Sequence, residues 1–494
     1  MSEQDVLGPF GAPVPEAQEA AQLRADELNL FDATAVAVSS VAPAYSLAST
    51  MAFVVAIVGV GVFAPSVIVA SFIPVLFIAY AYFHLNRKDP DCGASYAWLS
   101  KITRPSIGWF NGWVQVAAGA IFCVSASLLA GTYTLLFFNK VGWINANTAA
   151  NVWLTAVIGA AWLALITFIC IYGIRYTTNV QWILVIIEYV AVIGFSVAGI
   201  IKVAIFHPAG STSFHFGWLN PFHVTSWSAL ASGIALGVFF FWGWDTALNL
   251  SEESKDATRT PGRAAIISMW LLLAVFLINF VAVQMLLPPK VIAAQGGDVL
   301  FFFANQAFGS WAGYIMIIAV ISSTVATTQT TLLPSARITY SMARDKVFPK
   351  IFGRIHPRYL TPAVGTLALA GFSLIMMILV SGSPSVNDIF AKLILNIGVL
   401  VAFYYGITGV ACGWSFRKVA FEKISFFFMG VLLPIVAGGF LLYVGYEVIT
   451  SNGWNSALPD LIVLVGGIPL VIIARLTTKG DFFKVKPIAY DSID

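Results

Sequence analysis

The stretch FFFWGWDT, residues 239–246, places a glycine and a carboxylate inside an apolar segment that runs from 228 to 250. Gly243 is a flexible point in a helix, and Asp245 brings an ionisable group into a segment of membrane-spanning length. Backbone polar groups need partners in a bilayer, so a broken helix at this depth lines a cavity formed by protein or water. The stretch therefore predicts an all-helical membrane protein with an interrupted helix at a buried site.

A second interruption is expected in SSVAPAYS, residues 39–46, within the segment 33–58. Pro43 lacks a backbone donor and clashes with the preceding helical turn. Its small and hydroxylated neighbours allow another helix or a ligand to approach closely. A proline kink or a packing glycine is common in membrane helices, but interruptions at matching positions of two halves indicate the binding site of a transporter.

The composition is typical of a chain with many membrane spans. Apolar residues make up 59% of the 494 residues and charged residues 10%, whereas a soluble domain has about 25% charged residues. A bilayer core needs about 20 apolar residues per helix. On that length we expect twelve spans, at 33–58, 63–85, 107–138, 149–172, 178–204, 228–250, 264–287, 309–341, 362–381, 390–414, 425–448 and 457–475.

The distribution of basic residues predicts the orientation. If the N-terminus is cytosolic, the outer side carries only four of the 26 basic residues, namely Lys140, Lys202, Lys290 and Lys392. Cytosolic loops carry an excess of Lys and Arg, so we expect both termini in the cytosol. Residues 1–29 lack the basic and apolar regions of a signal peptide and are expected to form a partly disordered cytosolic tail. Residues 476–494 are expected to form a second cytosolic tail.

The two interrupted segments are the first and sixth spans, which cross the membrane in opposite directions. This predicts two five-helix units related by an inverted axis. The units are residues 30–204 and 228–414, and two further helices follow in 425–475. The alternative, two parallel six-helix halves, would pair the first span with 264–287, which has no matching break. We expect one membrane domain and no soluble one.

Ionisable groups inside the spans are candidate functional residues. Glu188 lies near the middle of span 178–204, where a lone carboxylate is costly and apolar surroundings favour the protonated form. It is therefore a candidate for proton coupling, with a carboxyl that only bonds a neighbouring helix as the alternative. Asp245 is a candidate partner for a substrate ammonium, with helix capping as the alternative.

Other polar and aromatic groups surround these two carboxylates in the sequence. The aromatic run 239–244 can supply cation–π contact to an amine. The run 322–331 is dense in hydroxyls, starting with Ser322 and Ser323, and is expected to face a cavity. Glu252 and Glu253 are expected to pair with Lys255, Arg259 or the loop after span 309–341 rather than to touch a substrate.

Three motifs in order make the chain similar to the amino acid–polyamine–organocation transporter superfamily. They are WGWD (242–245) followed by Glu252, Glu253 and Pro261; GASYAW (93–98) leading to GWFNGW (108–113); and SAR (335–337) with MARD (342–345), Phe348 and Pro349. The resemblance covers essentially the whole membrane region. It implies the LeuT-like inverted five-plus-five fold, with discontinuous helices 1 and 6 and a central site between helices 1, 3, 6, 8 and 10.

The resemblance also implies roles for particular residues. Phe239 matches the family's gating aromatic, and Glu188 matches the place where a lysine replaces a sodium ion in some proton-coupled relatives. Ion or proton coupling is thus expected at Glu188, Ser322 and Ser323. Substrate is expected at Ala42, Pro43, Ala44, Tyr45, Ser46, Phe239, Trp242, Gly243, Trp244 and Asp245.

The first interruption departs from the family pattern. Many amino acid carriers have a glycine-rich break in helix 1 whose free amides bind the substrate's α-carboxylate. Pro43 makes this break stiffer and removes one donor, which raises amines and polyamines as substrates. We expect a multi-pass plasma-membrane permease that takes up amino acids or related amines with a proton, or else sodium, as the coupling ion. A polyamine or organic-amine importer and an amino acid exchanger are the alternatives.

Other function classes fit the sequence less well. A channel needs a continuous polar stripe, whereas this chain has discrete breaks. The five histidines contain no HExxH motif, the four cysteines form no CxxC pair, and no phosphate-binding loop for ATP occurs. His207, His215 and His223 are more simply solvated loop residues than a zinc site. We expect no catalytic residue, cofactor, metal or nucleic-acid partner.

Overall fold

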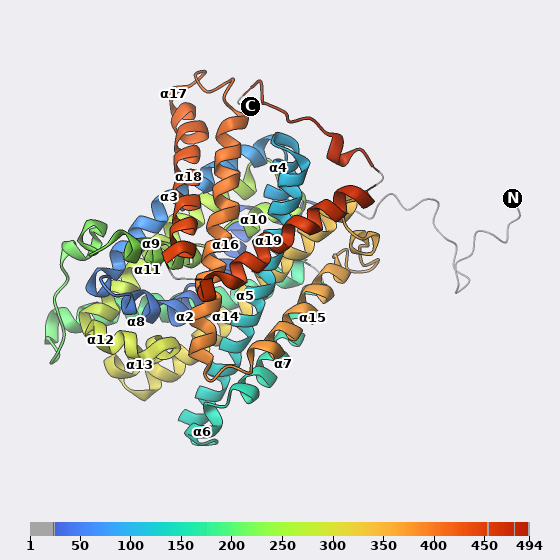
Figure 1. Ribbon diagram of the computed structural model, residues 1–494. Coiled ribbons are helices and arrows are strands. Elements are labelled where there is room, and N and C mark those ends of the chain that lie inside the picture. Colours follow the sequence, from blue (N-terminus) through green and yellow to red (C-terminus); the bar gives the residue numbers. More distant parts are fainter. Residues whose placement is uncertain (1–22, 24, 173, 452–453, 479, 493–494) are drawn as a thin grey trace, which may run out of the picture.

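The computed structural model describes residues 23, 25–172, 174–451, 454–478 and 480–492 of the chain. Every regular element in this part is a helix, and the only β-type contact there is an isolated bridge between Leu28 and Ser254. The helices pack around one another in one bundle (Figure 1). The prediction of an all-helical polytopic membrane protein is confirmed.

Eleven helical segments of the described residues are long and apolar enough to cross a membrane, judged by length and composition. They comprise α1 (Leu30–Val41) with α2 (Pro43–Ala56), α3 (Ala64–Lys88), α5 (Pro105–Lys140), α7 (Val152–Ile171), α8 (Ile174–Phe206), α11 (Thr260–Leu286), α14 (Ser310–Arg344), α15 (Ala363–Val380), α16 (Val386–Ser415), α17 (Ile424–Phe426) with α18 (Leu433–Ser451), and α19 (Trp454–Thr477). The remaining expected span, 228–250, consists of the shorter α9 (Trp227–Phe240) and α10 (Thr246–Asn249). The count of twelve spans stays a prediction.

The connecting segments contain four short helices that the hydropathy pattern did not predict. They are α4 (Ser95–Ile102), α6 (Ala146–Ala149), α12 (Pro289–Gln295) and α13 (Val299–Phe308). A search for apolar runs of about 20 residues misses helices of this length. Both α12 and α13 contact α2, so they cover the end of the first interrupted helix.

Apolar side chains cover the outside of the bundle. Val190 on α8 and Leu379 on α15 are each 69% exposed, and Ile462 on α19 is 62% exposed. Glu188, two residues before Val190, is fully buried. An apolar exterior around a partly polar interior fits a lipid environment rather than water.

The polar interior is organised around α14, which crosses the bundle and contacts α1, α2, α5, α8 and α10. Its hydroxyl-rich stretch 322–331 is buried throughout, and of this stretch only Thr331 lines the cavity described below. On the far side of the interior, α16 and α18 approach closely through Gly406 and Gly438. A Cβ at Gly406 would lie 2.8 Å from the carbonyl oxygen of Gly438. Such contacts between small residues hold membrane helices together.

The described parts of both termini contact segments that the sequence assigns to the cytosol. The amide of Leu28 donates to the carbonyl of Glu253 over 3.0 Å, and the amide of Tyr490 donates to the carbonyl of Ser415 over 3.0 Å. Leu23 and Leu28 are buried, so this end of the N-terminal segment is packed onto the bundle. The expected disordered tail falls mainly on residues 1–22 and 24, which lie outside the described residues.

Candidate substrate-binding and coupling site

Both predicted helix interruptions are confirmed, and they lie next to each other. Ala42, between α1 and α2, has φ of 48°, and α2 begins with Pro43. Gly243, between α9 and α10, has φ of 120°. The side-chain oxygens of Ser40 and Thr246 are 2.8 Å apart, which joins the end of α1 to the start of α10. The two breaks therefore form one site.

Replacing Gly243 with any other residue is expected to impair transport. A Cβ there would lie 2.8 Å from the Ser40 Oγ and 2.9 Å from the Ser40 carbonyl carbon, and φ of 120° is unfavourable for other residues. Gly243→Ala should reduce uptake by about 10-fold or more, at a strain of about 1–3 kcal/mol, in protein that still purifies as a single species. The matched control is Gly439→Ala on α18, where a Cβ meets nothing within 4 Å. Equal uptake by the two variants would contradict this role.

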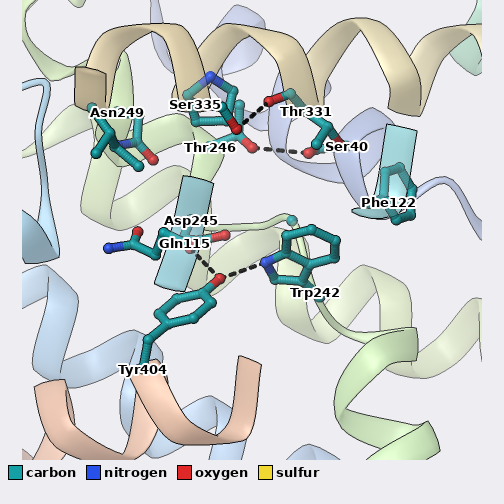
Figure 2. A pocket seen from close by; sticks show the side chains of 13 residues that line it. Ser40, Gln115, Phe122, Trp242, Asp245, Thr246, Asn249, Thr331, Ser335 and Tyr404 are labelled. Atoms are coloured by element: carbon teal, nitrogen blue, oxygen red, sulfur yellow. Dashed lines mark hydrogen bonds between the residues drawn. The ribbon is translucent and has the colours of Figure 1, made fainter. Parts of the chain in front are cut away.

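A cavity of about 30 Å³ lies beside the second interruption (Figure 2). That volume holds about one or two water molecules, so the site is nearly closed in this conformation and has to widen to admit a substrate. Side chains from both interrupted helices and from α5, α14 and α16 surround it. The lining residues are Ser40, Gln115, Phe122, Trp242, Gly243, Asp245, Thr246, Asn249, Thr331, Pro334, Ser335, Ile338 and Tyr404.

Asp245 is the acidic group of this cavity. Its side chain is 6% exposed. The Tyr404 hydroxyl donates a hydrogen bond to Asp245 Oδ2 over 3.1 Å, and the Trp242 indole N–H donates in turn to the Tyr404 hydroxyl (Figure 2). Within the described residues no basic side chain forms an ion pair with Asp245. The carboxylate is thus oriented by neutral donors but not neutralised, which suits a cationic ligand.

An aromatic cluster lies against Trp242 and Tyr45. The rings of Phe122 and Trp242 are 5.1 Å apart between centroids, and those of Phe122 and Tyr45 are also 5.1 Å apart. Phe239, the expected gating aromatic, lies 6.3 Å from the Tyr45 ring. These rings come from α2, α5, α9 and the break after α9, so any movement of the interrupted helices must rearrange them. The gating role of Phe239 stays a prediction.

Glu188 connects α8 to the first interruption and to α14. Its Oε1 accepts a hydrogen bond from the Ala44 amide over 2.8 Å and another from the Ser323 hydroxyl over 2.8 Å. The Tyr45 amide donates to Ser323 Oγ over 2.9 Å. Glu188 Oε2 is buried without a hydrogen-bond partner among the described residues. A carboxylate with one satisfied oxygen and one bare oxygen, far from water, is a place where a proton or a cation can bind.

The other residues predicted for the site are close by but have different partners. Trp244 does not line the cavity, and its ring packs against Tyr82 and Tyr405. The Ser46 hydroxyl donates to the Val41 carbonyl. The Ser322 hydroxyl donates to its own helix, at Ala319, so the structure brings Ser323 but not Ser322 to Glu188. The capping alternative for Asp245 is wrong, because its side chain accepts no hydrogen bond from the first turn of α10.

Sequence reasoning missed several residues of the cavity. Tyr404 on α16 holds the carboxylate of Asp245, while Gln115 on α5 and Asn249 on α10 supply amides to the wall. The resemblance placed the third and tenth spans at the site, and these are α5 and α16 in the structure. No local sequence pattern, however, marks the individual residues. The adjacent Tyr404 and Tyr405 in span 390–414 were one available signal, because a buried hydroxyl needs a partner.

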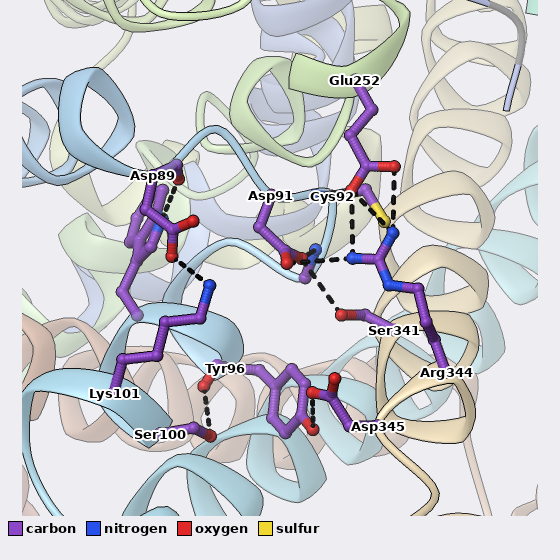
Figure 3. A network of polar contacts seen from close by, with 12 residues as sticks. Asp89, Asp91, Cys92, Tyr96, Ser100, Lys101, Glu252, Ser341, Arg344 and Asp345 are labelled. Carbon is purple, nitrogen blue, oxygen red and sulfur yellow. Dashed lines mark hydrogen bonds and ion pairs between the residues drawn. The ribbon is translucent and has the colours of Figure 1, made fainter. Parts of the chain in front are cut away.

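A polar network lies near the residues that the two chain ends contact (Figure 3). Arg344, at the end of α14, forms ion pairs with Asp91 at 2.9 Å and Glu252 at 3.1 Å. The Tyr96 hydroxyl donates to Asp345 over 2.7 Å, and burial raises the pKa of the Asp345 carboxyl above its usual value. The network joins α14 to the segments after α3 and after α10.

The partners of the two glutamates agree only in part with expectation: Glu252 pairs with the loop after span 309–341 as expected, whereas Glu253 pairs with an arginine inside that span. Glu252 pairs with Arg344, and Glu253 pairs with Arg337 inside α14 at 2.6 Å. Neither glutamate lines the cavity. Asp91, Cys92 and Glu252 bring possible metal ligands within 4.8 Å of one another, but the Arg344 guanidinium already forms ion pairs with both carboxylates.

Comparison with known proteins gives one consistent family. The amino acid permease profile matches residues 28–473. The low-affinity putrescine importer PlaP of Escherichia coli K12 is 26% identical over 379 residues, 75% of this chain and 78% of the relative. The branched-chain amino acid permease BcaP of Lactococcus lactis is 26% identical, over 69% of this chain and 72% of the relative. The human large neutral amino acids transporter small subunit 2 is 24% identical, over 85% and 74%. With its interrupted helices and a match that spans nearly all of its helical region, the chain belongs to the amino acid permease family.

Proposed function

We propose that this permease takes up amino acids or related amines across the plasma membrane together with protons. The observation that carries the proposal is Asp245, a buried carboxylate that lines a cavity without an ion-pair partner in the described part of the chain. Putrescine and branched-chain amino acids, for which two of the relatives are named, share an ammonium group. An ammonium bound at Asp245 would neutralise the carboxylate and donate charge-assisted hydrogen bonds to it.

Asp245 is proposed to bind the substrate's cationic nitrogen. Tyr404 already occupies one side of the carboxylate, since its hydroxyl donates to Oδ2. The nitrogen is therefore expected at the cavity side of the carboxylate, where Trp242 and Phe122 offer ring surfaces for the adjacent carbon atoms. Polar side chains on the opposite wall, such as Gln115 and Ser335, can bind further polar groups of the substrate.

Glu188 is proposed to carry the coupled proton at Oε2. In the ionised state its Oε1 accepts charge-assisted hydrogen bonds from Ala44 and Ser323, which are about twice as strong as neutral ones. Protonation at the bare Oε2 removes the buried charge and weakens both bonds. Because these bonds join α2 to α8 and α14, the proton would alter how firmly the first interrupted helix is held.

Alternating access in transporters built from two repeated halves is largely a movement of one half or bundle against the other. We infer that the halves are residues 30–204 and 228–414, related by inverted symmetry, with 425–475 outside the repeat. The ion pairs of Arg344 would then close the cytosolic side, with both termini in the cytosol. The positive-inside pattern and the contacts of Leu28 and Tyr490 support this orientation.

The coupling role is tested by Glu188→Gln. This variant keeps an oxygen acceptor for the Ala44 amide but cannot take up a proton at physiological pH. Wild-type uptake is expected to rise as the external pH is lowered, whereas uptake by Glu188→Gln should stay nearly constant over the same range. The measurement is initial uptake rate against external pH in proteoliposomes. The control is Glu422→Gln, at an exposed loop residue, which should keep the wild-type profile.

Four outcomes would change the proposal. If Glu188→Gln keeps the wild-type pH profile, proton coupling at this residue is wrong. If uptake follows an imposed sodium gradient instead, sodium is the coupling ion. Uptake only into vesicles preloaded with unlabelled substrate would make the protein an exchanger, and transport of diamines alone would make it a polyamine importer.

A further inference from the structure

The N-terminal end of α2 lies at the first interruption and presents backbone amides of the kind that bind an anion. A helix that starts inside the membrane exposes backbone amides that no preceding turn satisfies, together with the positive end of the helix dipole. In transporters with interrupted helices, such amides bind the carboxylate of the substrate. In α2, Pro43 has no amide hydrogen and the Ser46 amide donates to the Ala42 carbonyl over 2.9 Å. Ala44 and Tyr45 supply the two remaining donors.

Both remaining donors are taken by side chains of the protein. The Ala44 amide donates to Glu188 Oε1 over 2.8 Å, and the Tyr45 amide donates to Ser323 Oγ over 2.9 Å. Ser323 in turn donates to Glu188 Oε1 over 2.8 Å. The two amides, the Ser323 hydroxyl and the Glu188 carboxylate therefore bond to one another. The protein thus places its own carboxylate where a substrate carboxylate would otherwise bind.

The cavity offers neutral donors but no basic side chain that could balance the charge of an anion. Among its described lining residues none is Lys, Arg or His. Arg337, which lies on the same helix as the lining residue Ser335, is already paired with Glu253 at 2.6 Å. A substrate carboxylate would therefore enter a buried site that holds Asp245 and supplies no balancing charge. Unpaired buried charges and like-charge contacts each cost several kcal/mol.

We propose that this permease selects amines that lack an α-carboxylate, and that Glu188 excludes carboxylates by occupying the amides of α2. The proposal rests on the function proposed above, since it concerns the same site. Its substrates are primary amines or diamines whose cationic nitrogen binds Asp245. Amino acids with the same side chain are bound at least about 100-fold more weakly, because the cost of the unpaired carboxylate is several kcal/mol.

The test compares ligands that differ only at the carboxylate. Isoamylamine, leucinamide and leucine share a side chain, and cadaverine and lysine form a second pair. Binding is measured by thermal stabilisation of the purified full-length protein over a ligand titration. Isoamylamine, leucinamide and cadaverine should stabilise the protein at concentrations at least about 100-fold below those of leucine and lysine. Leucinamide separates the effect of charge from that of size.

Two results would overturn the proposal in distinguishable ways. If leucine or lysine binds within about 10-fold of its amine or amide, carboxylate exclusion is wrong and the transporter function stands. If no ligand of either series binds, the proposed function fails as well.

A pair of variants tests the role of Glu188 itself. Glu188→Ala frees the Ala44 amide and should reduce the ratio of the affinities for leucinamide and leucine by about 10-fold or more. Glu188→Gln still occupies that amide and should reduce this ratio less. An unchanged ratio in folded Glu188→Ala protein would show that Glu188 does not set the selectivity. If Glu188→Ala does not fold, the wild-type ligand series still decides the proposal.

Discussion

Asp245→Asn is expected to weaken the binding of a cationic amine by about 100-fold while leaving the protein folded. Asparagine has nearly the same shape and can still accept the hydrogen bond from Tyr404, but it cannot neutralise an ammonium. Removing one partner of a buried charge pair costs about 2–5 kcal/mol, and about 2.7 kcal/mol corresponds to 100-fold in affinity. The measurement is the thermal stabilisation of the purified variant over a titration with the amine.

Two control variants separate the effect of the Asp245 charge from other effects of the substitution. Asp388→Asn changes an exposed carboxylate at the start of α16 and should leave affinity unchanged. Tyr404→Phe removes the hydrogen bond to Asp245 but keeps the charge, so it should weaken binding by roughly 10-fold or less, as expected for one hydrogen bond to a charged group. An Asp245→Asn variant that binds the amine as tightly as wild type would remove Asp245 from the site.

Arg337→Leu is expected to have the largest effect on stability. Arg337 and Glu253 are each 1% exposed, and their ion pair measures 2.6 Å. Glu253 also anchors the N-terminal segment, because its carbonyl accepts from the amides of Glu27 and Leu28. Removing the arginine leaves a buried carboxylate without a cation, which costs about 3–5 kcal/mol. The thermal midpoint of the purified variant and its yield as a monodisperse species should both fall.

The double variant Arg337→Leu with Glu253→Leu separates lost charge balance from lost packing. It removes both charges and should recover most of the stability, because apolar replacements of a buried pair are often neutral. Arg344→Leu is the matched comparison, since Arg344 is 36% exposed in its side chain and its ion pairs are partly screened. A single Arg337→Leu variant as stable as wild type would show that this ion pair does not hold α14 to the segment after α10.

The helix interruptions could be predicted from the sequence because proline and glycine act locally. Pro43 and Gly243 each marked a break, and the structure has both. The exact turning residue of the first break could not be predicted, since alanine seldom adopts the φ of 48° that Ala42 has. That conformation follows from the tertiary contacts on both sides of the break, including the bond between Ser40 and Thr246.

Only individual residues of the candidate site could be predicted from the sequence, and not the contacts between them. A carboxylate in an apolar segment is conspicuous, so Asp245 and Glu188 were found. Their partners were not, because Tyr404 lies 159 positions from Asp245 and Ser323 lies 135 positions from Glu188. Helix packing alone decides which side chains meet over such separations. The same reason explains Trp244, which was predicted at the site from its neighbours in sequence but packs against Tyr82 and Tyr405.

The most direct test of proton-coupled amine transport is the uptake of labelled cadaverine into proteoliposomes that are alkaline inside and acidic outside. Amines collect passively on the acidic side of a membrane, so accumulation in the alkaline interior requires coupled transport. The wild-type protein is expected to accumulate cadaverine, a protonophore should abolish the accumulation, and Glu188→Gln should only equilibrate the label. Equal uptake by wild type with and without the proton gradient would contradict the account.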